Sequence, residues 1–143
     1  MIVVSKCLTG ACCRYDGKSK PEPNIRGLVD RGEAVAVCPE QLGGLPTPRV
    51  PAELTGSGEL VLDGMARVVA SDGRDVTEEY ISGAKEALRI ALEFGCTRAI
   101  LKSKSPSCGC GLVHDGSFTG GLTEGDGVTT ALFKRAGIEV ESM

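Results

Sequence analysis

The stretch T-E-E-Y-I-S-G-A-K-E-A-L-R-I-A-L-E-F-G-C-T-R-A-I-L, residues 77–101, carries the clearest structural signal in the chain. Asp75 or Thr77 can cap a helix here, because a short oxygen side chain accepts unpaired N–H groups of a first turn. Apolar residues then recur at helical spacing: Ile81, Ala84, Leu88, Ala91 and Leu92. Gly95 ends the helix, and residues 98–101 form a short apolar run typical of a buried strand. A helix that leads directly into a buried strand favours an α/β fold.

The rest of the chain repeats this alternation of short apolar strands with helices. The other predicted strands are residues 2–5, 34–37 and 138–140, and the other predicted helices are residues 24–31 and a last helix from an Asp126 cap to Gly137. Uninterrupted apolar strands are typical of a parallel sheet that is buried on both faces. We therefore predict a single three-layer α/β domain over residues 1–143, with a mainly parallel sheet, Rossmann-like or flavodoxin-like, and helices on both faces.

Two segments depart from this alternation. Residues 59–62 and 66–70 flank the turn dipeptide Asp63-Gly64, which predicts a β-hairpin. Residues 41–51 include G-G-L-P-T-P-R-V-P, which fits neither a regular helix nor a central strand. We expect residues 41–51 to form an ordered loop or a mobile lid.

Composition argues against several classes of protein. The 143 residues carry a net charge of −3, which provides no basic field for nucleic acid, and no apolar run is long enough to cross a membrane. The apolar start, Met1 to Val4, is too short for a signal peptide, so we expect a cytoplasmic protein. The seven cysteines are then better explained by metal binding or catalysis than by disulfides. Cys96, at a helix-to-strand turn, is interpreted as a small core residue.

Three cysteines follow three different predicted strands. Cys7 comes after residues 2–5, Cys38 comes after residues 34–37, and Cys108 lies in the loop after residues 98–101. The carboxyl ends of parallel strands meet at one edge of a sheet, where ligands bind. We therefore expect these three sulfurs to face one cavity, although they are far apart in the sequence.

Three convergent thiolates are compatible with two kinds of metal centre. Structural zinc normally takes four ligands, often in C-x-x-C pairs, and this chain has no such pair; His114 is available as a fourth ligand or is a locally bonded loop histidine. An iron–sulfur cluster is also held by thiolates. With three cysteines on a four-iron cluster, one iron keeps an open position and can act as a Lewis acid on a soft substrate atom.

Polar neighbours of the cysteines add candidate chemistry. Glu40 follows Cys38-Pro39 and is a candidate general acid or base; alternatively it is a solvated loop charge or a helix cap. Ser105 and Ser107 flank Pro106 beside Cys108, where they could contact substrate, hydrogen-bond to cluster sulfurs, or simply build a turn. No G-x-G-x-x-G or P-loop pattern is present to indicate nucleotide phosphates.

Five motifs, in order, resemble the bacterial domain-of-unknown-function 523 family over nearly the whole chain. They are C-L-T-G-A-C-C-R-Y-D-G at 7–17, C-P-E-Q-L-G-G-L-P-T-P-R at 38–49, G-R-D-V-T at 73–77, L-K-S-K-S-P-S-C-G at 101–109 and H-D-G-S-F-T-G at 114–120. The family usually has Y-D-G where this chain has H-D-G at His114. The chain also has Cys12, Cys13 and Cys110 as extra thiols near the expected site.

The resemblance implies an enzyme. The family includes thiouracil desulfidases, which carry a [4Fe-4S] cluster on three cysteines and replace the sulfur of a thiolated pyrimidine with oxygen. By this resemblance Cys7, Cys38 and Cys108 are the cluster ligands, and a small thiolated molecule is the substrate. Glu40 is then the candidate for proton transfer, and Ser105 or Ser107 for substrate contact. The alternatives are a non-catalytic iron–sulfur or metal-binding module such as a redox sensor, and a zinc-stabilised domain.

Overall fold

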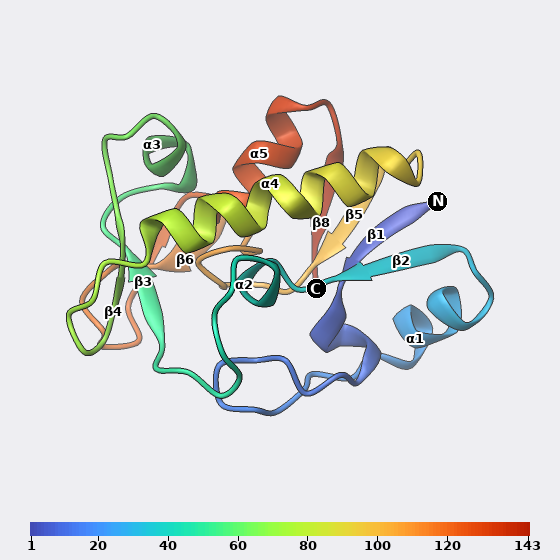
Figure 1. The fold of residues 1–143 in the computed structure, drawn as a ribbon, viewed down its shortest axis with the longest axis horizontal. Coiled ribbons are helices and arrows are strands. Elements are labelled where there is room, and N and C mark those ends of the chain that lie inside the picture. Colours follow the sequence, from blue (N-terminus) through green and yellow to red (C-terminus); the bar gives the residue numbers. More distant parts are fainter.

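A sheet of four parallel strands forms the centre of the molecule, in the order β2-β1-β5-β8 (Figure 1). The computed structural model describes all 143 residues. The four strands are β1 (Ile2–Ser5), β2 (Ala34–Val37), β5 (Arg98–Leu101) and β8 (Glu139–Ser142). β1 pairs in parallel with both β2 and β5, and β5 pairs in parallel with β8. The predicted parallel sheet is confirmed.

Helices cover both faces of this sheet. The helices of the chain are α1 (Pro23–Asp30), α2 (Pro39–Leu42), α3 (Gly58–Leu62), α4 (Thr77–Glu93), α5 (Val128–Arg135) and the short 3-10 helix η1 (Lys6–Thr9). Of these, α2 packs mainly on α4, and α3 packs mainly on α5. Val3 packs with Ala87 of α4 and Phe133 of α5 on one face, and Val4 packs with Ile25 of α1 on the other. Consecutive residues of a strand point to opposite faces, so β1 contributes to both cores. The three-layer α/β architecture is confirmed (Figure 1).

The predicted β-hairpin around Asp63-Gly64 is wrong. Residues 58–62 form α3, because Ser57 accepts a hydrogen bond from the N–H of Leu60 and caps the helix. The strand that follows is β4 (Val68–Ala70), and it pairs antiparallel with β3 (Ala52–Leu54) instead. Val61 is fully buried, so the apolar residues of this segment pack as one face of a helical turn and not as a strand.

A second antiparallel pair was not predicted. β6 (Leu112–His114) and β7 (Leu122–Glu124) pair within the Gly-rich segment that precedes α5. Every residue of β7 is exposed, so the strand lacks the alternation of apolar and polar residues that sequence patterns detect. β3 contacts β6, and the two pairs together form a small antiparallel region beside the central sheet (Figure 1).

Two predicted helix caps also change. Gly127, not Asp126, is the N-cap of α5, and Asp126 instead accepts hydrogen bonds from the N–H of Gly111 and from Lys134. Val76 is the N-cap of α4, and the Asp75 carboxylate accepts a hydrogen bond from the N–H of Thr77 at 2.9 Å.

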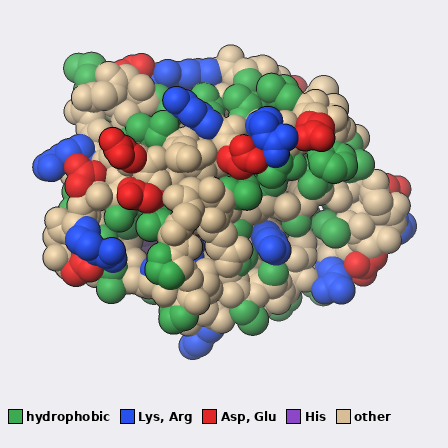
Figure 2. All heavy atoms as spheres, in the orientation of Figure 1, with side chains coloured by type: hydrophobic (Ala, Val, Ile, Leu, Met, Phe, Trp, Pro, Cys, Tyr) green, Lys and Arg blue, Asp and Glu red, His purple; other side chains and the backbone are tan.

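The surface mixes charges of both signs. Lys and Arg side chains are interspersed with Asp and Glu on the face that Figure 2 shows, which has the orientation of Figure 1. None of the helices combines the length and the apolar character that a membrane crossing requires.

Candidate functional site

A cavity of about 450 Å³ lies at the carboxyl end of the parallel sheet. One side is lined by residues that directly follow β1, β2 and β5, and another side is lined by residues of β3, β6 and the loop after β6. Cys7, Cys38 and Cys108 all line this cavity and are all buried. The structure therefore brings together the three cysteines that the topology of parallel strands predicts.

Cys7 lies in η1, the single turn of 3-10 helix that follows β1. Its carbonyl oxygen accepts hydrogen bonds from the backbone N–H groups of Gly10 and Lys20. The loop after η1 is thereby folded back against the cysteine. At the end of the same strand, Ser5 accepts a hydrogen bond from the N–H of Lys102, which ties the end of β1 to the end of β5.

Cys38 is the N-cap residue of α2, and it is held in place by the packing of α2 on α4. Gly83 makes this packing possible, because a Cβ atom there would overlap the carbonyl oxygen of Pro39. Two backbones can approach so closely only where a side chain is missing. The position of Cys38, next to Pro39, therefore depends on a glycine of α4 that is distant in sequence.

Cys108 lies in a loop that is docked on the first turn of α5. The carbonyl oxygen of Ser107 accepts the N–H groups of Thr129 and Thr130, and the Thr130 hydroxyl donates to the carbonyl of Cys108 at 2.9 Å. These contacts satisfy N–H groups that the start of a helix otherwise leaves unpaired. Gly127 is required at this junction, because a Cβ atom there would overlap the carbonyl oxygen of Ser107. The start of α5 thus holds Cys108 against the cavity.

Cys13 is a fourth buried thiol of this cavity. Its sulfur interacts with those of Cys7 and Cys38, and its carbonyl accepts a hydrogen bond from the Cys38 thiol at 3.8 Å. Cys12 is exposed, and neither Cys12 nor Cys110 lines the cavity. Sequence reasoning grouped Cys13 with the other extra thiols, because no pattern in the loop distinguishes the two adjacent cysteines.

The protein environment favours the protonated thiol at Cys13, Cys38 and Cys108. A hydrogen bond with Cys13, together with burial, raises the pKa of Cys38 far above its usual value. The pKa of Cys108 is also raised far above its usual value, mainly by burial and secondly by the nearby charge of Glu40. The hydrogen bond with Cys38 lowers the pKa of Cys13. The hydrogen bond with Cys7 and burial raise this pKa by more, so that it reaches about 11. Metal binding at this site must therefore displace protons.

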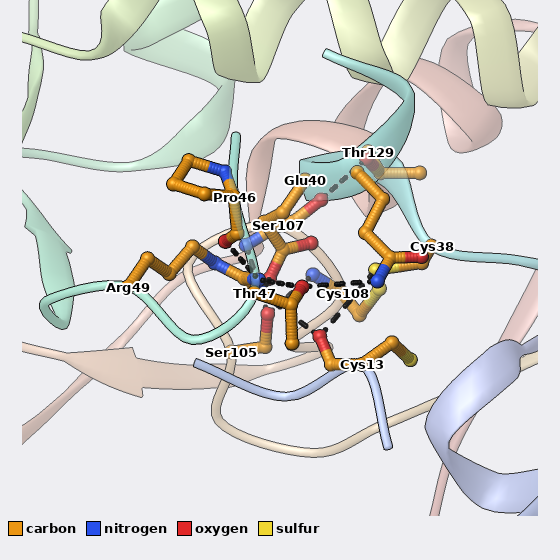
Figure 3. A network of polar contacts seen from close by, with 11 residues as sticks. Cys13, Cys38, Glu40, Pro46, Thr47, Arg49, Ser105, Ser107, Cys108 and Thr129 are labelled. Carbon is orange, nitrogen blue, oxygen red and sulfur yellow. Dashed lines mark hydrogen bonds and ion pairs between the residues drawn. The ribbon is translucent and has the colours of Figure 1, made fainter. Parts of the chain in front are cut away.

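Glu40 lies at the cavity in a nearly buried ion pair with Arg49. The two side chains are 14% and 6% exposed, and Arg49 Nη2 lies 3.3 Å from Glu40 Oε2. Arg49 also donates to the carbonyl oxygens of Cys13 and Pro46 and to the Thr47 hydroxyl (Figure 3). The prediction of no helix in residues 41–51 is wrong for Gln41 and Leu42, which belong to α2 because Pro39 can begin a helix. The rest of the segment is a loop that links the Cys13 loop to Glu40.

The two predicted serines have different surroundings. Ser105 lines the cavity, and its hydroxyl accepts hydrogen bonds from the N–H groups of Ser107 and Cys108 (Figure 3). Ser107 is fully buried and does not line the cavity. Its hydroxyl lies 2.7 Å from that of Thr129 and also interacts with the Cys108 thiol. Ser107 is thus positioned beside a cysteine and not beside the space that a substrate would occupy.

The other side of the cavity belongs to the antiparallel region. Glu53 of β3, His114 of β6 and Phe118 of the following loop line it. Glu53 is buried, and its Oε1 accepts the backbone N–H groups of Gly116 and Phe118. Sequence reasoning did not find Glu53 or Phe118, and it considered His114 only as a metal ligand or a loop residue.

The donor groups fit a cluster better than a single ion. The His, Cys, Asp and Glu side chains form no group of three or more that could hold one metal ion. All seven cysteines are free, and four of them border the same cavity. The structure therefore offers no ligand set for the structural zinc ion considered above. A multinuclear cluster spreads its ligands over a larger volume, and thiolates are its usual ligands.

The fold and this cavity define an α/β protein with a thiol-lined site at the carboxyl end of a parallel sheet. The sequence pattern of the 2-thiouracil desulfurase family matches residues 2–143, and the chain belongs to this family. It is the family that the five sequence motifs indicated.

Two relatives extend this comparison. The chain is 50% identical to the "Uncharacterized protein YbbK" of Bacillus subtilis (strain 168) over 143 residues, which cover 99% of this chain and 95% of that protein. Its structure resembles that of the [4Fe-4S]-dependent thiouracil desulfidase TudS (DUF523Vcz), with a TM-score of 0.87 and 47% identity, over 99% of this chain and 89% of the other.

Proposed function

We propose that this protein is a desulfidase that carries a [4Fe-4S] cluster and removes sulfur from a thiolated pyrimidine such as thiouracil. Water replaces the sulfur, so that a C=S bond becomes C=O and hydrogen sulfide leaves; the reaction needs no electron donor or acceptor. The convergence of Cys7, Cys38 and Cys108 on one cavity is the observation that carries the proposal. Membership of the 2-thiouracil desulfurase family and the similarity to TudS support it.

Cys7, Cys38 and Cys108 are the proposed cluster ligands. Each follows a different strand of the sheet, and each is anchored by backbone hydrogen bonds or close helix packing, so the three sulfurs are held on rigid elements. A four-iron cluster on three thiolates supplies one iron without a protein ligand, which is a Lewis acid suited to a soft sulfur atom.

Glu40 is the proposed acid–base group. Its carboxylate borders the cavity together with the cysteines, and the Arg49 guanidinium, which also lines the cavity, donates a hydrogen bond that orients it. An attacking water must lose protons and the departing sulfide must gain them, and a positioned carboxylate can transfer both. The ion pair with Arg49 compensates for the cost of keeping this charge in a nearly buried place.

Ser105 is the remaining serine candidate for substrate contact, because it borders the cavity. Its hydroxyl oxygen already accepts the N–H of Cys108, so it also orients the loop of a proposed ligand. For Ser107 we propose only a supporting role, through its contact with the Cys108 thiol.

A reducing compartment such as the bacterial cytoplasm suits this chemistry. All seven cysteines are free, and thiols persist in a reduced cytosol. We propose a small thiolated molecule as the partner, because the cavity of about 450 Å³ is within the usual range for small ligands.

Anaerobic reconstitution with iron and sulfide tests the proposal. We expect a protein with about four irons per chain that releases sulfide from 2-thiouracil or 4-thiouracil and forms uracil, measured by chromatography. A protein that binds the cluster but releases no sulfide from either compound would instead be a binding or sensing module. A protein that takes up zinc in place of iron would contradict the proposal altogether.

A further inference from the structure

His114 has a buried ring nitrogen without a hydrogen-bond partner, and its side chain borders the cavity. Nδ1 of His114 is one of only two buried side-chain nitrogen or oxygen atoms in the chain that lack a partner. The residue lies at the end of β6, opposite Leu122 of β7. A buried polar atom without a partner is destabilising, so such an atom in a side chain that borders a cavity favours a ligand that supplies the missing bond.

The residues around His114 favour a flat ligand. Phe118 lines the same cavity and is 41% exposed, so one part of its ring is available at the cavity. Its backbone has a φ of 59°, in the left-handed region that non-glycine residues rarely adopt, and the Glu53 carboxylate holds its N–H at 3.2 Å. Strained backbone that a neighbouring group holds in place is common at binding and active sites. Aromatic rings stack well on flat heterocycles.

We propose that Glu53, His114 and Phe118 form the recognition wall for the pyrimidine ring, with the His114 ring turning on binding so that Nδ1, which is buried in the unliganded protein, bonds to a polar atom at the ring edge. The inference rests on the proposed function and deepens it. Cys7, Cys38 and Cys108 border the cavity from the sheet side, so a ring whose sulfur points to them presents its far edge to the antiparallel side. In 4-thiouracil that edge carries N1–H and the adjacent C2=O, and an imidazole nitrogen can pair with either, as an acceptor or as a donor.

The test compares His114→Leu with His114→Asn in the reconstituted protein. Leu removes the polar atom, whereas Asn keeps one near the place of Nδ1. For His114→Leu we expect the Kd for uracil, by calorimetry, and the KM for 4-thiouracil to rise roughly tenfold, with a smaller change in kcat. His114→Asn should recover most of this loss. Leu112→Asn, an exposed position in the same strand that does not line the cavity, should bind like the wild type.

Methylated ligands give a test that needs no variant. One of the two compounds 1-methyluracil and 3-methyluracil should carry its methyl group where it blocks the hydrogen bond to His114 Nδ1. We expect the wild type to bind that compound roughly tenfold more weakly than uracil, and His114→Leu to bind it and uracil with equal Kd. An unchanged Kd and KM in His114→Leu, or failure of the wild type to bind uracil, would overturn the inference.

The two proposals can fail separately. If sulfide is released and the His114 variants bind uracil like the wild type, the recognition wall is wrong and the desulfidase proposal stands. If no sulfide is released but uracil binding depends on His114, the desulfidase proposal is wrong and the recognition wall stands.

Discussion

The two sides of the cavity are built in different ways. The thiol side, with Cys7, Cys38 and Cys108, comes from the ends of buried parallel strands and is held by backbone hydrogen bonds and by glycine-mediated packing. The antiparallel side, with Glu53, His114 and Phe118, comes from strands of three residues and a surface loop. The first side thus depends on the central sheet and its helices, and the second on short strands and a loop.

This difference matches two different demands. A cluster needs its ligands at fixed separations, which rigid elements guarantee. Recognition of a substrate can be changed at Glu53, His114 and Phe118 without disturbing the cofactor, because these residues are outside the hydrophobic core clusters. We infer that the antiparallel side is where selectivity among thiolated substrates is set.

The strongest test removes one proposed ligand and compares it with the neighbouring thiol. We expect Cys108→Ser to lose most of its iron and to release sulfide only at background level, because no other side chain occupies its place at the start of α5. Cys13→Val should retain iron, since Val fills a similar volume and only the extra thiol is lost. Iron and acid-labile sulfide assays decide the matter. Equal iron loss in both variants would make Cys13 a ligand as well.

The second prediction concerns proton transfer on the thiol side. Glu40→Gln should reduce kcat by about 10²–10⁴, because an amide cannot transfer the proton, while iron content stays unchanged. Gln retains an oxygen that can accept the hydrogen bond from Arg49. Steady-state sulfide release measures the effect, with Glu78→Gln on the exposed surface of α4 as control. A Glu40→Gln enzyme with normal kcat would remove Glu40 from the chemistry.

The third prediction tests whether helix packing holds the thiol side together. Gly83→Ala should lower the free energy of unfolding by about 1–3 kcal/mol or more and reduce iron uptake, since the added methyl group displaces Pro39 and with it Cys38. Urea unfolding of the cluster-free protein measures the loss. Ser82→Ala, one residue away and exposed, should be nearly neutral. Similar stability of the two variants would show that α2 can shift without cost.

The smallest expected effect lies on the antiparallel side and depends on pH. The Ser117 hydroxyl and then its backbone N–H lower the pKa of Asp115 below the ordinary 3.8. As the pH falls, Asp115 is therefore protonated in the unfolded chain before it is protonated in the folded protein. The stabilisation by Asp115 is complete above pH 3.8 and is lost as the pH falls through the lower pKa of the folded state.

The contribution of Asp115 should be small, because the group is exposed and water screens its interactions. Urea unfolding between about pH 5 and pH 3 measures it, and Asp115→Asn should flatten this part of the profile. A wild type and an Asp115→Asn variant with parallel profiles would show that the loop does not depend on this carboxylate.

The errors of sequence interpretation concentrate on the antiparallel side. The pairs β3–β4 and β6–β7 consist of three-residue strands, and all of β7 is exposed, so neither length nor alternation marks them. The apolar run before Asp63 is compatible with a strand or a helical turn, and the Ser57 cap with the burial of Val61 decides for the helix. Local patterns are weakest where elements are short.

The sequence by itself determined the class of fold, the family and the convergence of Cys7, Cys38 and Cys108. It could do so because short uninterrupted apolar runs that alternate with helices indicate a buried parallel sheet, and the carboxyl ends of parallel strands lie at one edge. Only the tertiary structure decided that Cys13 joins those thiols, that Arg49 supports Glu40, and that His114 is left unpaired at the cavity. These facts depend on how loops cross one another in space, and no local pattern of residues encodes such crossings.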